Sequence, residues 1–102
     1  MPKGYVILTE AIKDPEGMKA YGQAAGAAMA GVGVLAVDAK PQVLEGSWHG
    51  NQTVVLEFDS VEAARQWYES EAYQEAVELR HAAADCNVVI ISGLERPSAV
   101  GS

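Results

Sequence analysis

Four short runs of this chain are rich in β-branched and aromatic residues, which is typical of β-strands. They cover residues 5–9, 34–37, 53–58 and 88–91. We expect the second run to bend around Pro41 and to continue as a strand at 42–45. Glycine, serine and asparagine are frequent from Gly46 to Gln52, which predicts a hairpin loop before the third run.

Apolar residues at helical spacing predict a helix after the first strand and another after the third. The first helix is expected to run from Pro15 to about residue 30, with Asp14 as its cap. Gly22 and Gly26 lie inside it and indicate close packing, because glycine weakens a helix by about 1 kcal/mol relative to alanine. Ser60 is the expected cap of the second helix, which should break and restart at Ser70.

The resulting order is β-α-β-β-α-β, so the predicted fold class is α+β of the ferredoxin-like type. Two helices then cover one face of a four-stranded antiparallel sheet. Residues 53–58 and 88–91 are apolar on both faces, so the second face also needs a cover. A second copy of the chain provides one by two-fold symmetry, which predicts a homodimer through the open sheet face. We expect one domain over residues 1–94 and a polar tail over 95–102.

The charge balance excludes some partners. The net charge is −7, from 14 acidic against 7 basic residues, and the basic residues are scattered. Nucleic acids and anionic membrane surfaces are therefore not expected as partners. Cys86 is the only cysteine, and neither a signal peptide nor an apolar run of about 20 residues is apparent. These features favour a cytoplasmic protein.

Several spaced motifs are shared with a known family. They are residues 43–46 with Trp48, 55–58 with Ser60, 67–68 with Ser70, and 73–74 with Arg80. Together the motifs resemble the bacterial domain-of-unknown-function family 1330, within the dimeric α+β barrel superfamily. The resemblance spans residues 4–93 and implies a ferredoxin-like protomer whose sheet pairs face to face with a second sheet.

The resemblance implies no activity, because the family is uncharacterised. The superfamily includes muconolactone isomerases, cofactor-free monooxygenases and haem-degrading enzymes, and a shared fold does not transfer their chemistry. This chain also departs from the family pattern. It has Val37-Asp38-Ala39 in place of the usual Arg-Gly-Gly, and Gln52 where a basic residue is common.

Charged residues at apolar positions are the first candidates for chemistry. Arg80 lies on the apolar stripe of the second helix, where it would either clamp a substrate carboxylate or join a structural ion pair, the commoner case. Glu57 lies mid-strand among apolar residues, so it is either a general acid or base, or the partner of Arg80 or of a hydroxyl. Glu45 is similar but nearer a turn. His49, in the loop, is either an accessory acid or base, or simply exposed.

The aromatic residues add a predicted cleft. Tyr5, Tyr21 and Tyr73 are expected to line a space between the sheet and the helices, with Trp48 at its mouth. No metal site is expected, because His49 and His81 form no cluster with each other or with Cys86. No glycine-rich phosphate loop follows a strand, and no cofactor is expected.

Three functions remain open at this point. The first is an enzyme acting on a small organic acid or aromatic, by proton transfer or by a cofactor-free oxidation. In it Glu57 is the acid or base, Arg80 the clamp and His49 an accessory. The second is a ligand-binding module without catalysis, and the third is a homodimeric interaction domain. They are distinguished by whether Arg80 and Glu57 point into a cavity or only at each other.

Overall fold

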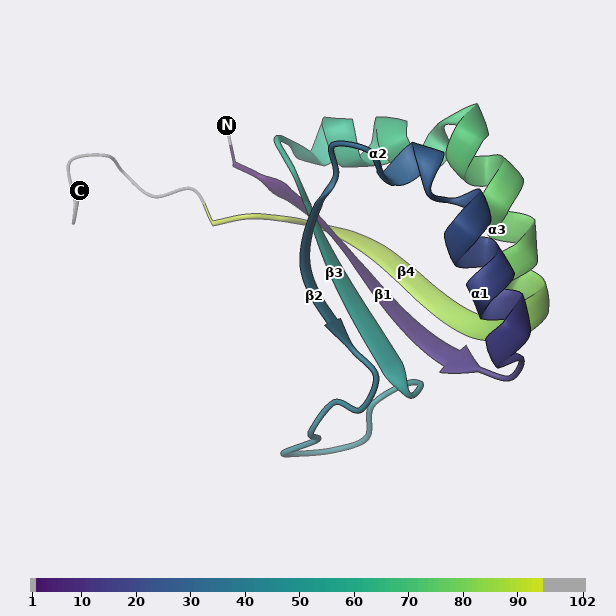
Figure 1. Cartoon of the computed structure of the whole chain (residues 1–102). Helices are drawn as coiled ribbons and strands as arrows, with labels where there is room; N and C mark the ends of the chain where they lie inside the picture. The colour runs from purple at the N-terminus through teal and green to yellow at the C-terminus, as the bar shows by residue number, and fades with distance from the viewer. Residues whose placement is uncertain (1, 95–102) are drawn as a thin grey trace.

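The computed structural model describes residues 2–94 and shows a four-stranded sheet with helices on one side (Figure 1). The strands are antiparallel and lie in the order β2-β3-β1-β4. The elements are β1 (Gly4–Ile12), α1 (Pro15–Ala24), the 3₁₀ turn η1 (Ala27–Met29), β2 (Gly33–Asp38), β3 (Gln52–Phe58), α2 (Val61–Glu69), α3 (Glu71–Ala83) and β4 (Ala84–Ser92). The predicted ferredoxin-like fold is confirmed. The predicted tail at 95–102 lies outside the described residues.

The two serines predicted as helix caps act as such. The Ser60 hydroxyl accepts a hydrogen bond from the Ala63 backbone N–H at 3.0 Å. The Ser70 hydroxyl accepts one from Tyr73 N–H at 3.3 Å and donates one to the Trp67 carbonyl at 2.7 Å. Ser70 therefore ends α2 and begins α3, as predicted. Asp14 occupies the cap position of α1, but its side chain makes no capping hydrogen bond.

Two predicted elements are shorter in the structure. The first helix ends at Ala24 and not near residue 30. Beyond Ala24 the backbone forms 3₁₀-type hydrogen bonds between residues three apart, such as Gly26 N–H to Gln23 O at 3.2 Å. The strand expected at 42–45 is a loop. Asp38 ends β2 by accepting the Lys40 N–H at 2.8 Å, and Pro41 has no N–H to donate to a neighbouring strand.

The close packing expected at Gly22 and Gly26 is wrong for Gly22, whereas a Cβ on Gly26 would lie 3.3 Å from the Gln23 carbonyl oxygen. A Cβ built at Gly22 would meet nothing within 4 Å. The close approach lies one turn earlier, where a Cβ on Gly17 would come within 2.8 Å of the Ala83 Cβ. Gly17, not Gly22, is therefore the glycine of α1 that faces α3 at short range.

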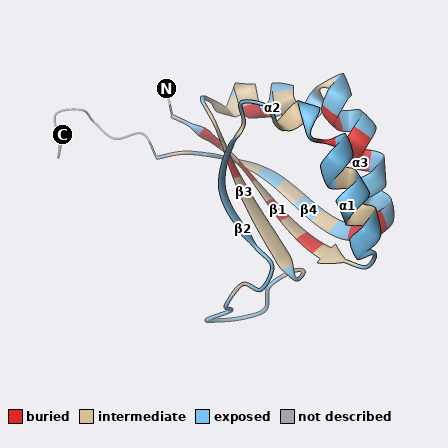
Figure 2. Cartoon of the chain, viewed as in Figure 1, coloured by how far each residue is buried: buried red, intermediate tan, exposed pale blue. Residues whose placement is uncertain are grey.

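Alternation along β1 assigns its side chains to two different environments. Val6, Leu8 and Glu10 lie on the face that the helices cover and are buried, whereas Tyr5 and Ile7 lie on the open face. Figure 2 shows buried positions on β1 and on α3, while β2 is exposed along its whole length. The main core is formed by Val6, Leu8, Leu56 and Ala64, and a second cluster by Ala25, Tyr73, Ala76 and Val77.

The open face of the sheet is apolar and uncovered in the single chain. Val89 and Ile91 of β4 point to this side and are 51% and 45% exposed. Leu44, in the loop at 39–51, is 89% exposed. Among residues 2–94, no helix has the length and hydropathy needed to cross a lipid bilayer.

Candidate functional site

A cavity of about 570 Å³ lies between the sheet and the helices. Most of its wall is apolar, from side chains that include Leu8, Met29, Val54, Leu56 and Trp67. Val37 of β2 and Gly22 of α1 also line it, and both are exposed. The mouth of the cavity therefore lies between β2 and α1, where the helices do not reach the edge of the sheet.

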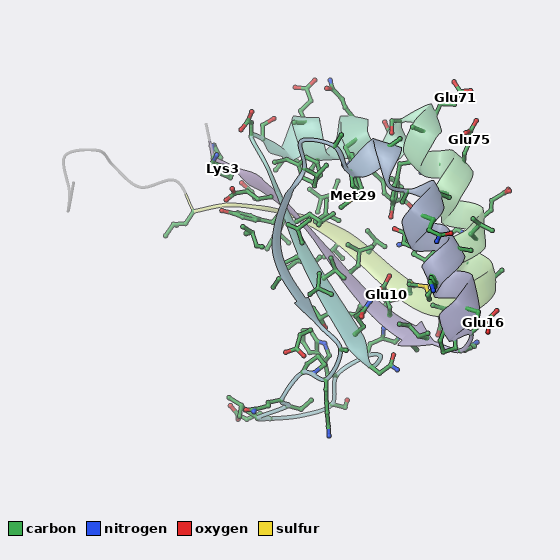
Figure 3. The ribbon with its side chains drawn as sticks, viewed as in Figure 1. Lys3, Glu10, Glu16, Met29, Glu71 and Glu75 are labelled. Atoms are coloured by element: carbon green, nitrogen blue, oxygen red, sulfur yellow. The ribbon has the colours of Figure 1, made fainter. Side chains whose placement is uncertain are left out.

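Glu10 places a carboxylate in the wall of this apolar cavity. The residue is only 2% exposed, and Figure 3 shows its side chain in the space between β1 and the helices. Gln52, its partner on β3, donates a hydrogen bond from Nε2 to Glu10 Oε1 at 2.8 Å. The second oxygen makes no hydrogen bond within the described part of the chain. Glu10 thus keeps an acceptor for a ligand.

Two tyrosines on neighbouring helices supply hydrogen-bond donors to the same cavity. The hydroxyls of Tyr21 and Tyr73 are 2.6 Å apart, and both residues line the cavity. Burial raises the pKa of Tyr21 and of Tyr73 above the ordinary value, so both phenols stay protonated near neutral pH. Their mutual hydrogen bond uses one of the two hydroxyl protons. The other proton is available to a ligand.

Arg80 lies behind this tyrosine pair and not on the cavity wall. It is 1% exposed, and its guanidinium carbon is 5.9 Å from the centroid of the Tyr21 ring. Its Nε and Nη1 atoms are buried and have no hydrogen-bond partner among residues 2–94. No ion pair within that range includes Arg80. Arg80 therefore contributes a buried positive charge close to the phenols.

The predicted pairing of Arg80 with Glu57 is wrong, because the sheet separates the two residues. Glu57 lies on the open face, where it accepts a hydrogen bond from its cross-strand neighbour Tyr5 at 3.2 Å. A hydroxyl is thus the partner of Glu57. The same contact shows that Tyr5 does not line the cleft that was predicted for all three tyrosines.

The loop residues also lie on the open side. Trp48 donates its indole N–H to Thr53 Oγ1 at 2.8 Å and is 52% exposed, so it is not at the mouth of the cavity. His49 Nδ1 is 2.7 Å from Thr9 Oγ1, and its Nε2 is 3.7 Å from an Asp85 carboxylate oxygen. Glu45 is exposed in the loop. These contacts fix the loop to the sheet and place the Trp48 and His49 side chains on the face opposite the Glu10 carboxylate.

Cys86 faces the helices opposite Glu10 in the sheet register. Burial raises the pKa of the Cys86 thiol, which disfavours the reactive thiolate. The described residues contain no group of three histidine, cysteine, aspartate or glutamate side chains that could hold a metal ion. Glu10, Gln52 and the tyrosine pair, with Asn51 and Lys19, are therefore the polar lining residues that can act in the cavity.

Glu10 was not among the residues singled out from the sequence. The first strand was predicted to end at Thr9, so Glu10 was placed outside it. The signal was present nonetheless: Val6, Leu8 and Glu10 are each two residues apart, which places all three on one face of a strand.

The fold and the cavity define an α+β protomer of the ferredoxin-like type found in dimeric α+β barrels. The chain belongs to the family described as "Domain of unknown function (DUF1330)", whose model matches residues 3–94. No curated protein matches the sequence.

Solved structures of several proteins have the same fold. A protein of unknown function from Rhodopseudomonas palustris is 22% identical, with a TM-score of 0.71 over 93% of this chain and 85% of that one. A dimeric ferredoxin-like protein of unknown function from Thermobifida fusca is 15% identical, with a TM-score of 0.61 over 89% and 91%. SnoaB, a cofactor-independent oxygenase from Streptomyces nogalater, is 8% identical, with a TM-score of 0.65 over 96% and 99%.

Proposed function

We propose that this protein binds a small, mostly apolar organic molecule in the cavity and catalyses a proton transfer through Glu10. The ligand carries a hydroxyl, carbonyl or carboxyl group that reaches Glu10. One observation carries the proposal: a carboxylate only 2% exposed, with one oxygen free of hydrogen bonds, lines an otherwise apolar cavity of ligand size.

The groups around Glu10 suit acid–base chemistry. Glu10 accepts a proton from the ligand, and Gln52 holds the carboxylate in place by its hydrogen bond of 2.8 Å. The Tyr21–Tyr73 pair donates a hydrogen bond to a ligand oxygen, and the charge of Arg80 behind it stabilises the anion that forms when Glu10 removes the proton. SnoaB has this fold and is described as a cofactor-independent oxygenase, which supports chemistry without a bound cofactor.

The proposed working form is a homodimer through the open face. Two features support it: the exposed apolar side chains of Val89 and Ile91, and the dimeric description of the Thermobifida fusca protein. The free Cys86 thiol supports a reducing compartment, such as the cytoplasm.

The test is a ligand screen followed by a measurement of proton exchange. Phenols and small organic acids are added to the native protein and to the variants Glu10→Gln and Glu57→Gln, and thermal shifts identify binders. The binders are then incubated in D₂O, and NMR follows deuterium incorporation at acidic C–H positions. Glu57→Gln is the matched control, because it changes a carboxylate on the other face of the same sheet.

We expect binding to all three proteins, with exchange in the native protein and in Glu57→Gln but not in Glu10→Gln. Binding without exchange in the native protein would make this a non-catalytic binding module. Absence of binding by every compound would leave the interaction-domain hypothesis.

A further inference from the structure

We infer that the ligand is an elongated amphiphile, with a hydrogen-bonding head at Glu10 and an apolar body that ends at Trp67. This inference rests on the proposed function, because it assigns the shape and orientation of a ligand in the same cavity. Three features carry it: the length of the cavity along the strands, the position of its polar groups, and the fixed residue at its far end.

The cavity extends along the strands. Ile12 of β1 lines it at one end, and Leu56 of β3 lines it at the other. Leu56 pairs with Val6, so the lining covers six residue steps of β1. At about 3.3 Å per residue this is a length of about 20 Å. A cavity of about 570 Å³ with that length accommodates a narrow molecule better than a round one.

On the strand side of the cavity, polar groups occupy only one part of this length. Glu10 and Gln52 are paired across β1 and β3, and Asn51 precedes Gln52 in the lining. From Glu10 to the level of Val6 the strand wall becomes apolar over four residue steps, or about 13 Å, while the helix wall carries Lys19, Tyr21 and Tyr73. Figure 3 shows Met29 near the α2 end of the space between the sheet and the helices, and Glu10 farther along it toward Glu16. A ligand that satisfies Glu10 therefore extends its apolar part toward Met29.

Trp67 forms a fixed wall at the apolar end. Its indole N–H donates to the Ala28 carbonyl at 2.8 Å, and its ring lies 4.1 Å from the ring of Tyr73 and 5.2 Å from that of Phe58. A side chain held on several sides does not swing away to admit a longer ligand. The distance from Glu10 to Trp67 therefore sets an upper limit on the length of the ligand.

The experiment uses para-alkylphenols of increasing chain length, from phenol to para-octylphenol. Their affinity is measured by calorimetry, and quenching of Trp67 fluorescence is followed in a Trp48→Phe background. Each added methylene that is buried should strengthen binding about fourfold. The gain in affinity should stop once the apolar part of the alkylphenol has filled about 13 Å of the cavity. Quenching of Trp67 should begin only with the longer members.

Two variants move the expected limit in opposite directions. Trp67→Leu opens the end wall and should allow longer chains to keep gaining affinity. Met29→Phe fills the same end while leaving Trp67 in place, so the longest alkyl chain that still gains affinity should be shorter by one or more methylenes. This variant tests the inference even where Trp67→Leu does not fold.

The outcomes separate this inference from the proposed function. If phenol binds and the organic acids show Glu10-dependent exchange, but affinity does not change along the alkylphenol series, the length selection is wrong and the proposed function stands. If affinity rises but neither variant moves the limit, Trp67 is not the end wall and the assigned orientation is wrong. If no member binds, including phenol, both proposals fail.

Discussion

Replacing Arg80 by methionine should stabilise the protein. Arg80 is 1% exposed, and its Nε and Nη1 atoms have no hydrogen-bond partner among the described residues. Methionine keeps an unbranched stem for packing and removes the buried donors. The expected result is therefore the reverse of what truncation of a buried side chain usually gives.

The magnitude follows from the two donors and from the contact with Tyr21. Each buried donor without a partner costs about 1–3 kcal/mol, so removing two recovers about 2–6 kcal/mol. Loss of the guanidinium over the Tyr21 ring, at 5.9 Å, costs about 2 kcal/mol, and the shorter side chain leaves some space unfilled. The net expectation for Arg80→Met is a gain of about 1–2 kcal/mol in the free energy of unfolding.

The assay is urea unfolding at a fixed protein concentration, because the proposed dimer would make apparent stability depend on concentration. Arg65→Met is the control. Arg65 is exposed and pairs with Glu69 one turn away at 3.7 Å, so its loss should change stability by less than about 1 kcal/mol. A loss of about 3 kcal/mol or more for Arg80→Met would refute the reasoning, because that is the cost of breaking a buried ion pair.

Three further predictions concern other parts of the molecule. Cys86 should react with Ellman's reagent more slowly than a free thiol at pH 8, because burial raises its pKa, and a rate equal to that of free cysteine would contradict this. Gly50→Ala should destabilise the fold far more than Gly31→Ala in thermal melts. Both glycines have φ of +81°, but only a Cβ at Gly50 would meet backbone atoms of β1, at 2.5 Å, so equal losses would argue against that contact. Stability should fall as pH rises above about 10, because Tyr21 and Tyr73 have raised pKa values when folded and ordinary ones, near 10.0, when unfolded. Replacing both tyrosines by phenylalanine should flatten that alkaline decline in urea midpoints measured from pH 8 to 11.

Much of the fold was predictable because local signals and the tertiary arrangement agree. The serine caps at Ser60 and Ser70 and the alternation in β3 each specify an element without reference to the rest of the chain. The errors arose where local signals compete. Residues 42–45 have strand-like composition, but the turn at Asp38 and the proline at 41 separate them from the sheet.

The site was only partly predictable, for a geometric reason. Helical spacing correctly placed Tyr73 and Arg80 on a buried stripe of α3. The face on which a strand residue lies depends on register, and a shift of one position moves a side chain to the other side. Pairing with Arg80 is therefore one alternative that the sequence leaves open for Glu57, although Glu57 faces the open side. Glu10 is missed because the predicted strand ends at Thr9, three residues before the end of β1 at Ile12.

The loop at 39–51 contacts β1, the strand that carries Glu10. One layer of strands therefore separates the loop on the open side from the cavity on the helix side. Asn51 N–H donates to the Glu10 carbonyl at 2.9 Å, Ile12 N–H donates to the Asn51 side chain at 3.0 Å, and His49 contacts Thr9. Thr9 and Glu10 are consecutive, so a single peptide link joins a side chain on the loop side to the carboxylate in the cavity. A partner chain that contacts the loop would therefore bear directly on the residue proposed to bind the ligand.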